Sequence, residues 1–191
     1  MKKIGITGGI GVGKTYVSNI LRKMNYPVYN SDIIAKEFLE NDPNLMSLIK
    51  NNFGDKIYSD NKINKSLVAS LIFSNDDLLR KFNSIVHPYV FEDFKKWCKN
   101  QQSSIIFKEA AILFESDAVK DLDCVICVTA NKDIRLKRII SRDNKTVDEI
   151  GSIMSKQMDQ QKKEELSDYV ITNDGDSSIL LQIDKILTDL K

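Results

Sequence analysis

The chain has few of the residues that mark several protein classes. Its 191 residues include only three cysteines, three prolines and one histidine. A small, odd number of cysteines does not build a disulfide framework, and so few prolines exclude a proline-rich linker. No apolar run approaches the roughly 20 residues needed to cross a bilayer. We therefore expect a reduced, cytoplasmic protein that is not embedded in a membrane.

Charge of either sign is also not in excess. Lysine and arginine number 28 against 27 acidic residues, which gives a net charge of +1. A dedicated nucleic-acid binder usually carries a basic excess on one face, so near-neutrality argues against such a partner. The length suits one domain, or one domain with an inserted lobe.

Glycine and arginine are scarce, and both are clustered. Five of the eight glycines lie within the first thirteen residues. Of the five arginines, three (Arg135, Arg138 and Arg142) fall within eight residues. These two clusters are the first places to look for a functional site.

Short apolar runs alternate with stretches of helical periodicity. Runs without polar alternation are typical of strands covered on both faces of a parallel sheet. We expect strands over 3–7, 27–29, 104–107, 124–128 and 169–171. The sequence predicts an α/β fold, a three-layer doubly wound parallel sheet of about five strands.

The alternation stops over about 32–103, where helical pieces near 32–40, 43–52, 64–74 and 76–100 are expected and no strand. We interpret the whole chain, 1–191, as a single domain with this stretch as an inserted helical lobe. A second helical segment, about 131–165, carries the arginine cluster and then a run of Lys, Glu and Gln.

The segment from Gly8 to Thr15 fits the phosphate-loop pattern G-x-x-x-x-G-K-[ST], between an expected strand and an amphipathic helix. Glycines let the backbone N–H groups surround a phosphate, and the following helix start adds a positive dipole end. Lys14 would bridge the β- and γ-phosphates, and the Thr15 hydroxyl would ligate Mg²⁺. The alternative is a glycine-rich turn without a ligand. The motif predicts binding of a nucleoside triphosphate.

The type of phosphate-loop protein follows from other features. A GTPase needs N-K-x-D after a late strand, and the nearest match, starting at Asn131, has Ile134 in the fourth place. The short chain, the helical insertion and the arginine cluster instead favour a small phosphotransferase. Spacings of i, i+3 and i+7 put the three arginines on one helix face, where they would suit phosphate oxygens, although a solvated basic face has the same pattern.

Asp32 follows the second expected strand at its carboxyl end, where ligands gather in open α/β sheets. It could accept a hydroxyl proton and help to organise Mg²⁺. It could equally be the N-cap of the next helix. The residues alone do not choose between these roles.

Five segments together resemble the dephospho-coenzyme A kinase family, in its order and over nearly the whole chain. They are Thr7–Thr15 with its G-G-I-G core, Ser31–Ala35, Val86-His87-Pro88, Glu109–Glu115 and Val170–Gly175. The resemblance implies a phosphate-loop, nucleoside-kinase-like fold with an acceptor-binding insertion and a lid over 131–165. It implies that ATP phosphorylates the ribose 3′-hydroxyl of dephospho-coenzyme A, the final step of coenzyme A biosynthesis.

The resemblance also implies residue roles. The catalytic residues would be Asp32, as general base, with Lys14 and Arg138. ATP would be bound by Gly9, Gly11, Val12, Gly13, Lys14, Thr15, Tyr16, Arg142 and Asn173. The acceptor would be bound by Asp32, Lys65, His87 and Arg138, and Mg²⁺ by Thr15 and Glu109. We expect dephospho-coenzyme A as the small-molecule partner, and a monomer or small homo-oligomer.

The sequence departs from the family pattern at four positions. Asn30 replaces an acid, Lys65 an arginine, Ala111 a common proline, and Lys163 lies where arginine is frequent. His87 could also be a polar residue that ends a turn before Pro88. Another small-molecule or nucleotide kinase, or a non-enzymatic nucleotide-dependent switch, remains as an alternative function.

Overall fold

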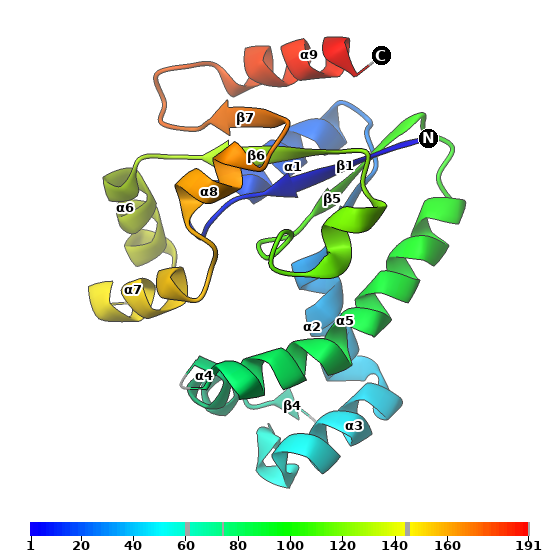
Figure 1. Ribbon diagram of the computed structural model, residues 1–191, viewed down its shortest axis with the longest axis vertical. Coiled ribbons are helices and arrows are strands. Elements are labelled where there is room, and N and C mark those ends of the chain that lie inside the picture. The colour runs from blue at the N-terminus through cyan, green and yellow to red at the C-terminus, as the bar shows by residue number, and fades with distance from the viewer. Residues whose placement is uncertain (60–61, 74, 144–145, 191) are drawn as a thin grey trace. The chain divides into compact units, whose positions relative to one another are not determined.

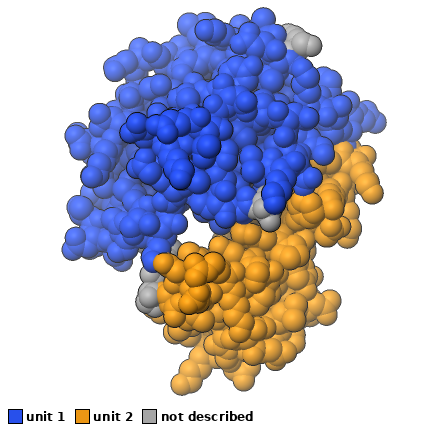
Figure 2. Space-filling view, in the orientation of Figure 1, with its two compact units in different colours: residues 1–30, 101–191 blue, residues 31–100 orange. Residues whose placement is uncertain are grey.

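The computed structural model describes residues 1–59, 62–73, 75–143 and 146–190. The chain divides into two compact units, coloured in Figure 2. The first unit comprises Met1–Asn30 and Gln101–Lys191, and the second comprises Ser31–Asn100. The second unit is therefore an insertion in the chain of the first.

The first unit is built on a five-stranded sheet with strand order β2-β5-β1-β6-β7 (Figure 1). Every adjacent pair is parallel, which confirms the predicted fold class. Each strand lies within two residues of its predicted range: β1 (Lys2–Thr7), β2 (Val28–Asn30), β5 (Ile105–Glu109), β6 (Cys124–Thr129) and β7 (Tyr169–Thr172).

The main core of this unit lies on one face of the sheet, beneath two helices. These are α1 (Lys14–Lys23) and α9 (Ile179–Asp189), which lies beside β7 in Figure 1. Leu21 of α1 and Ile183 of α9 are buried with Ile6 and Ile126 of the strands. Apolar burial of this extent is the main stabilising contribution to the unit.

The opposite face of the sheet is covered by shorter elements. A smaller cluster of Ala110, Leu113 and Val125 lies there, under the 3₁₀ turn η2 (Asp117–Asp121). The predicted segment 131–165 forms three helices: α6 (Lys132–Asp143), α7 (Val147–Ser155) and α8 (Gln160–Glu165). Of these, α8 packs against β6.

The second unit is mainly helical, with α2 (Ser31–Asn41), α3 (Pro43–Phe53), a 3₁₀ turn η1 (Asp55–Ile57), α4 (Lys65–Phe73) and α5 (Asp76–Lys99). The prediction that it holds no strand is wrong. Two short antiparallel strands, β3 (Tyr58–Ser59) and β4 (Lys62–Ile63), pair within it. Strands of two residues are too short to show a period of alternation, so the sequence pattern could not indicate them.

The core of the second unit combines aliphatic and aromatic side chains. Leu45, Ile49 and Phe94 are almost completely buried. Phe53 and Phe82 meet edge to face with ring centroids 5.7 Å apart, a favoured aromatic geometry. Of the helices that the structure describes, none is long and apolar enough to cross a membrane.

Candidate active site

The phosphate loop joins β1 to α1 at the carboxyl edge of the sheet. Gly8 and Gly13 adopt φ angles of 139° and 95°, which side chains other than hydrogen rarely allow. A Cβ at Gly8 would clash with the carbonyl oxygen of Val128, and one at Gly13 with the amide of Asn173. These glycines are therefore required by both backbone conformation and close packing.

The start of α1 is suited to an anion. Gly13 occupies the N-cap and provides no side-chain cap. The first turn of α1, all of it described, carries no acidic residue that would compete for its N–H groups. Unsatisfied N–H groups and the helix dipole together attract a phosphate.

Lys14 folds back over the loop. Its Nζ donates hydrogen bonds to the carbonyl oxygens of Gly8 and Gly9, at 2.8 and 3.2 Å. The ammonium group is thus held beside the first carbonyl groups of the loop. A cation at this place can contact the terminal phosphates of a bound nucleotide.

Thr15 and Glu109 meet at the ends of two neighbouring elements. Thr15 Oγ1 donates to Glu109 Oε1 at 2.8 Å, and Asn30 Nδ2 donates to Glu109 Oε2 at 2.7 Å. Glu109 is the last residue of β5 and only 2% exposed. Its two oxygens are held by hydrogen bonds, so the carboxylate is fixed beside the hydroxyl of the phosphate loop.

This pair fits a magnesium ion that is shared with phosphates. Mg²⁺ prefers oxygen donors, and it is usually held by one or two carboxylates plus substrate phosphates and water. In the part of the chain that the structure describes, no group of three or more His, Cys, Asp or Glu residues could hold a metal. The oxygen donors of Thr15 and Glu109 instead match a site where one carboxylate, a hydroxyl and substrate phosphates share the ion.

Asn173 and Arg138 close the loop from the other side. Asn173 Nδ2 donates to the carbonyl oxygen of Val12 at 2.8 Å. Arg138 Nη2 donates to the carbonyl oxygen of Asn173 at 2.9 Å, and its Nη1 reaches the Val12 carbonyl oxygen at 3.4 Å. Arg138 is half-buried and Asn173 is 9% exposed. The structure thus brings both predicted residues to the phosphate loop.

A pocket of about 570 Å³ lies next to these residues. Tyr16 and Ile20 of α1 form one wall, and Ile179 and Leu180 of α9 form another. Arg138 and Asn173 line it beside Gly13, so the pocket opens at the phosphate loop. A mostly apolar pocket with a few polar groups is typical of a site for a planar organic ligand, such as a nucleotide base.

The three clustered arginines do not have the same surroundings. Arg135 is buried, and its Nε donates to the carbonyl oxygen of Ile10 at 2.9 Å. Burial lowers the pKa of its guanidinium. Arg142 is exposed and binds Asp143 through two nitrogens, each at 2.7 Å, which raises the pKa of Arg142. Thus Arg135 supports the phosphate loop from within the fold, whereas Arg142 has a solvent-exposed ion pair.

Three of the four predicted acceptor residues, Asp32, Lys65 and His87, belong to the second unit, whereas Arg138 belongs to the first. Asp32 is exposed in the first turn of α2, one residue after the helix begins at Ser31. It therefore lies inside the helix and not at the N-cap that was considered as an alternative. Lys65 is the first residue of α4, and its side chain lies outside the described part of the structure.

His87 lies inside a helix. It is half-buried within α5, which continues through Pro88. The alternative of a polar residue ending a turn is therefore wrong. A proline within a helix removes one backbone hydrogen bond, and α5 packs against α2, α3 and α4 of the same unit.

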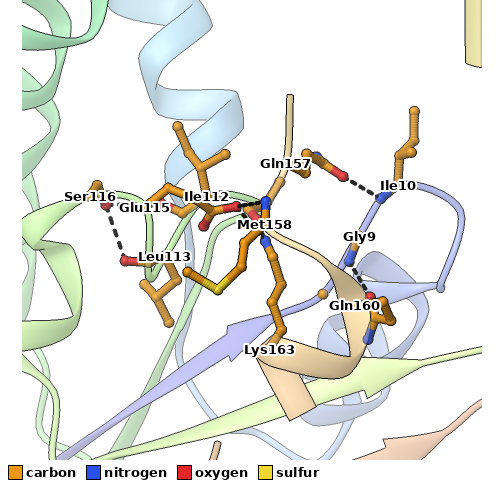
Figure 3. Close-up of polar contacts among 12 residues, drawn as sticks. Gly9, Ile10, Ile112, Leu113, Glu115, Ser116, Gln157, Met158, Gln160 and Lys163 are labelled. Carbon is orange, nitrogen blue, oxygen red and sulfur yellow. Dashed lines mark hydrogen bonds and ion pairs between the residues drawn. The ribbon is translucent and has the colours of Figure 1, made fainter. Parts of the chain in front are cut away.

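Two residues that no sequence pattern pointed to, Gln157 and Gln160, contact the phosphate loop. Gln157 Oε1 accepts the N–H of Ile10, and Gln160 Oε1 accepts the N–H of Gly9 (Figure 3). Each pair is separated by about 150 positions in the chain. The polar run after the arginine cluster was visible in the sequence, but no local spacing connects it to the phosphate loop.

Lys163 is buried, although it belongs to a run of polar residues that would be expected to be exposed. Its side chain is completely buried, where Nζ donates to the carbonyl oxygen of Ala111 at 2.6 Å and forms an ion pair with Glu115 at 2.8 Å. Two of the four departures from the family pattern, Ala111 and Lys163, therefore contact each other.

Comparisons with known proteins agree with this geometry. A model of the dephospho-CoA kinase family matches residues 2–178. A dephospho-CoA kinase from Bacteroides fragilis is 36% identical, covering 98% of this chain and 92% of that relative. One from Chlorobaculum tepidum is 38% identical over 90% of this chain and 86% of the relative. The crystal structure of TT1252 from Thermus thermophilus has a TM-score of 0.86 at 26% identity, covering 100% of this chain and 98% of that one.

Proposed function

The chain belongs to the dephospho-CoA kinase family, and we propose that it transfers the γ-phosphoryl group of ATP to the ribose 3′-hydroxyl of dephospho-CoA. The products are coenzyme A and ADP. The observation that carries the proposal is the contact between Thr15 of the phosphate loop and Glu109 of β5, beside an N-terminal helix end that is free of acidic residues. This arrangement offers a polyphosphate both N–H donors and a metal-binding pair.

ATP would lie with its phosphates in the loop and its base in the neighbouring pocket. The N–H groups of Gly11 to Thr15 would contact the phosphates, and Lys14 would add its positive charge from the carbonyl groups of Gly8 and Gly9. Tyr16 and Asn173 line the pocket, so they would contact the nucleoside. Arg138, which lines the same pocket, would contact the transferred phosphoryl group.

Thr15 and Glu109 would hold Mg²⁺. When bound, the metal neutralises charge on the β- and γ-phosphates and so favours transfer. The role of the protein is to fix the donors, and Asn30 does so by donating to the second oxygen of Glu109. Positioning and electrostatic stabilisation are the main contributions a protein makes to phosphoryl transfer.

Asp32 would act as the general base. It follows β2 by two residues and is exposed. A carboxylate can take the proton of the 3′-hydroxyl as the oxygen attacks the γ-phosphorus, while the bond to the β-γ bridging oxygen breaks. Lys65 and His87 of the same unit would bind the acceptor, and Arg142 would turn from Asp143 to the phosphates when the site closes.

The test is a panel of acceptors. Formation of ADP from ATP is measured with dephospho-CoA, adenosine, a nucleoside monophosphate or shikimate, each with Mg²⁺. We expect rapid ADP formation with dephospho-CoA, and only a slow background with the others. A similar rate with another acceptor would support a different small-molecule kinase.

A variant of the phosphate loop distinguishes turnover by this protein from turnover by a contaminating kinase. Lys14→Ala removes the ammonium group from the loop, and we expect it to lower the rate by at least about a hundredfold. The cytoplasmic location and the monomeric or small oligomeric state stay predictions. Tight ATP binding without turnover on any acceptor would favour a nucleotide-dependent switch instead.

A further inference from the structure

The turn between α7 and α8 and the first residue of α8 are hydrogen bonded to the phosphate loop through two glutamine side chains. Gln157 Oε1 accepts the N–H of Ile10 at 2.9 Å, and Gln160 Oε1 accepts the N–H of Gly9 at 2.8 Å (Figure 3). These N–H groups are the first in the loop after Gly8. A glutamine side chain contacts each of them, so the start of the loop is held from the side of α8.

The direction of the Gln160 amide is fixed at its other end. Its Nε2 donates to the carbonyl oxygen of Val128 at 3.3 Å and to Glu164 Oε1 at 3.2 Å. It also contacts Cys127 Sγ at 3.2 Å. Rotation of this amide would break all of these contacts, so its oxygen is held toward Gly9.

The turn itself is anchored to the loop that follows β5. Lys163 pairs with Glu115, whose Oε1 also accepts the N–H of Met158 at 2.8 Å. Ser116 closes that loop by donating to the carbonyl oxygens of Ile112 and Leu113 (Figure 3). The glutamines therefore project from a backbone that is tied to the part of the chain just after Glu109.

Ile10 is held on both sides of its peptide unit. Gln157 accepts its N–H, and Arg135 donates to its carbonyl oxygen at 2.9 Å. By contrast, the N–H groups of Gly11, Val12 and Gly13 find no acceptor among the described residues. The loop thus separates into a first part bound to the protein and a second part whose donors are available to phosphate oxygens.

We propose that Gln157 and Gln160 are positioning residues of the phosphate loop, which preorganise it for ATP by accepting its first two N–H groups. A loop that is already ordered loses less conformational freedom when the nucleotide binds, so the nucleotide is bound more tightly. The glutamines act through the backbone and not on the transferred group. This proposal rests on the proposed function only in requiring that the loop binds ATP.

The test compares two substitutions of Gln157 with a matched control. Gln157→Ala removes the side chain, and Gln157→Met keeps its length but lacks the acceptor oxygen. The control is Gln161→Ala, because Gln161 is exposed on α8 and its side chain bonds only Glu165 among the described residues. The dissociation constant of ATP is measured by calorimetry without acceptor, and the thermal midpoint by calorimetric scanning.

We expect both Gln157 variants to bind ATP about tenfold more weakly, because a loop that is not held beforehand must be ordered when the nucleotide binds. Their thermal midpoints and the KM for dephospho-CoA should stay close to those of the parent, and Gln161→Ala should match the parent throughout. Normal ATP binding by Gln157→Met would overturn the proposal, because side-chain packing would then be sufficient. A lower thermal midpoint with unchanged ATP affinity would also overturn it, by showing a structural role.

The two proposals fail in different ways. If dephospho-CoA is not the acceptor, turnover with it is absent but the ATP affinities still differ between the Gln157 variants and the control. If the glutamines do not position the loop, the affinities are equal while dephospho-CoA is still phosphorylated. The same three proteins in the two assays therefore distinguish the outcomes.

Discussion

Asn30 shows how the charge at the site depends on single side chains. Its Nδ2 donates to Glu109, whose other oxygen accepts from Thr15. An acid at position 30, as in the family pattern that the sequence resembles, would place a second carboxylate against Glu109, and the two like charges would repel. The amide instead donates a hydrogen bond to Glu109 and adds no second negative charge. This departure is therefore compatible with a magnesium-binding acid at the end of β5.

Asp32 is the residue whose replacement most directly tests the chemistry of the site. Asp32→Asn keeps the size of the side chain but removes its ability to accept a proton. We expect the turnover number to fall by about 10²- to 10⁴-fold, the usual contribution of a general base. The dissociation constant of ATP should stay near that of the parent. Steady-state kinetics and calorimetry measure the two quantities.

A matched control for Asp32 lies on the same helix. Glu37 is an exposed acid on α2, and Glu37→Gln removes one negative charge from that helix without touching position 32. We expect normal turnover from it. Near-parental turnover of Asp32→Asn would show that Asp32 is only a residue of the first helical turn.

A substitution of Glu109 tests whether this residue helps to bind magnesium. Glu109→Gln keeps a similar shape but removes the negative charge beside the Thr15 hydroxyl. We expect the Mg²⁺ concentration for half-maximal activity to rise about tenfold, since loss of a supporting group around a metal commonly has this size of effect. A magnesium titration at saturating ATP measures it. An unchanged magnesium requirement would place the metal away from β5.

At the scale of elements, the short helix α8 depends on one buried ion pair. Lys163 is completely buried against Glu115, whose side chain is 21% exposed. Lys163→Met leaves Glu115 without its partner, and removal of one member of a buried pair costs about 3–5 kcal/mol of the free energy of unfolding. Urea unfolding measures this difference.

The neighbouring lysine supplies the comparison for this prediction. Lys162 is exposed on the same helix, so Lys162→Met should change the free energy of unfolding by less than about 0.5 kcal/mol. If both substitutions had the same small effect, the Lys163–Glu115 pair would not hold α8 to the loop after β5.

The sequence predicted elements well where they are long and periodic. The expected helices near 43–52 and 76–100 correspond to α3 and α5, and the five sheet strands were all expected. The β3–β4 hairpin was missed because it has two residues in each strand. Similarly, the sequence placed the phosphate loop between a strand and a helix, but it did not indicate the Gln157–Ile10 contact. Contacts between distant positions depend on the packing of whole elements, which a local pattern does not encode.

At the scale of the whole molecule, two cysteines are expected to lower the free energy of unfolding at alkaline pH. Burial raises the pKa of the Cys127 thiol to about 11. Burial, with the nearby charges of Asp168 and Asp123, raises the pKa of Cys124 to about 11 as well. The ordinary value is 9.0, so above about pH 9 the unfolded chain loses thiol protons that the folded chain keeps. The free energy of unfolding should therefore fall as the pH rises from about 9 to 11.

The thiol contribution can be isolated by substitution. Urea midpoints at pH 7.5 and pH 10 are compared for the parent and for Cys127→Ala. The variant is expected to be less stable at both values, because a buried side chain is shortened, but to lose less stability between them. An equal loss in the two proteins would show that Cys127 does not carry this pH dependence.

In the proposed function, the residues that bind ATP lie in the first unit, and three of the four that bind the acceptor lie in the second. The measurement that tests this account most directly compares dephospho-CoA with its 3′-deoxy analogue as acceptor, with ADP formation as the readout. The account predicts fast ADP formation with dephospho-CoA, a product that carries one additional phosphate at the 3′ position, and only background with the analogue. Equal rates with the two compounds, or no stimulation by dephospho-CoA, would contradict it.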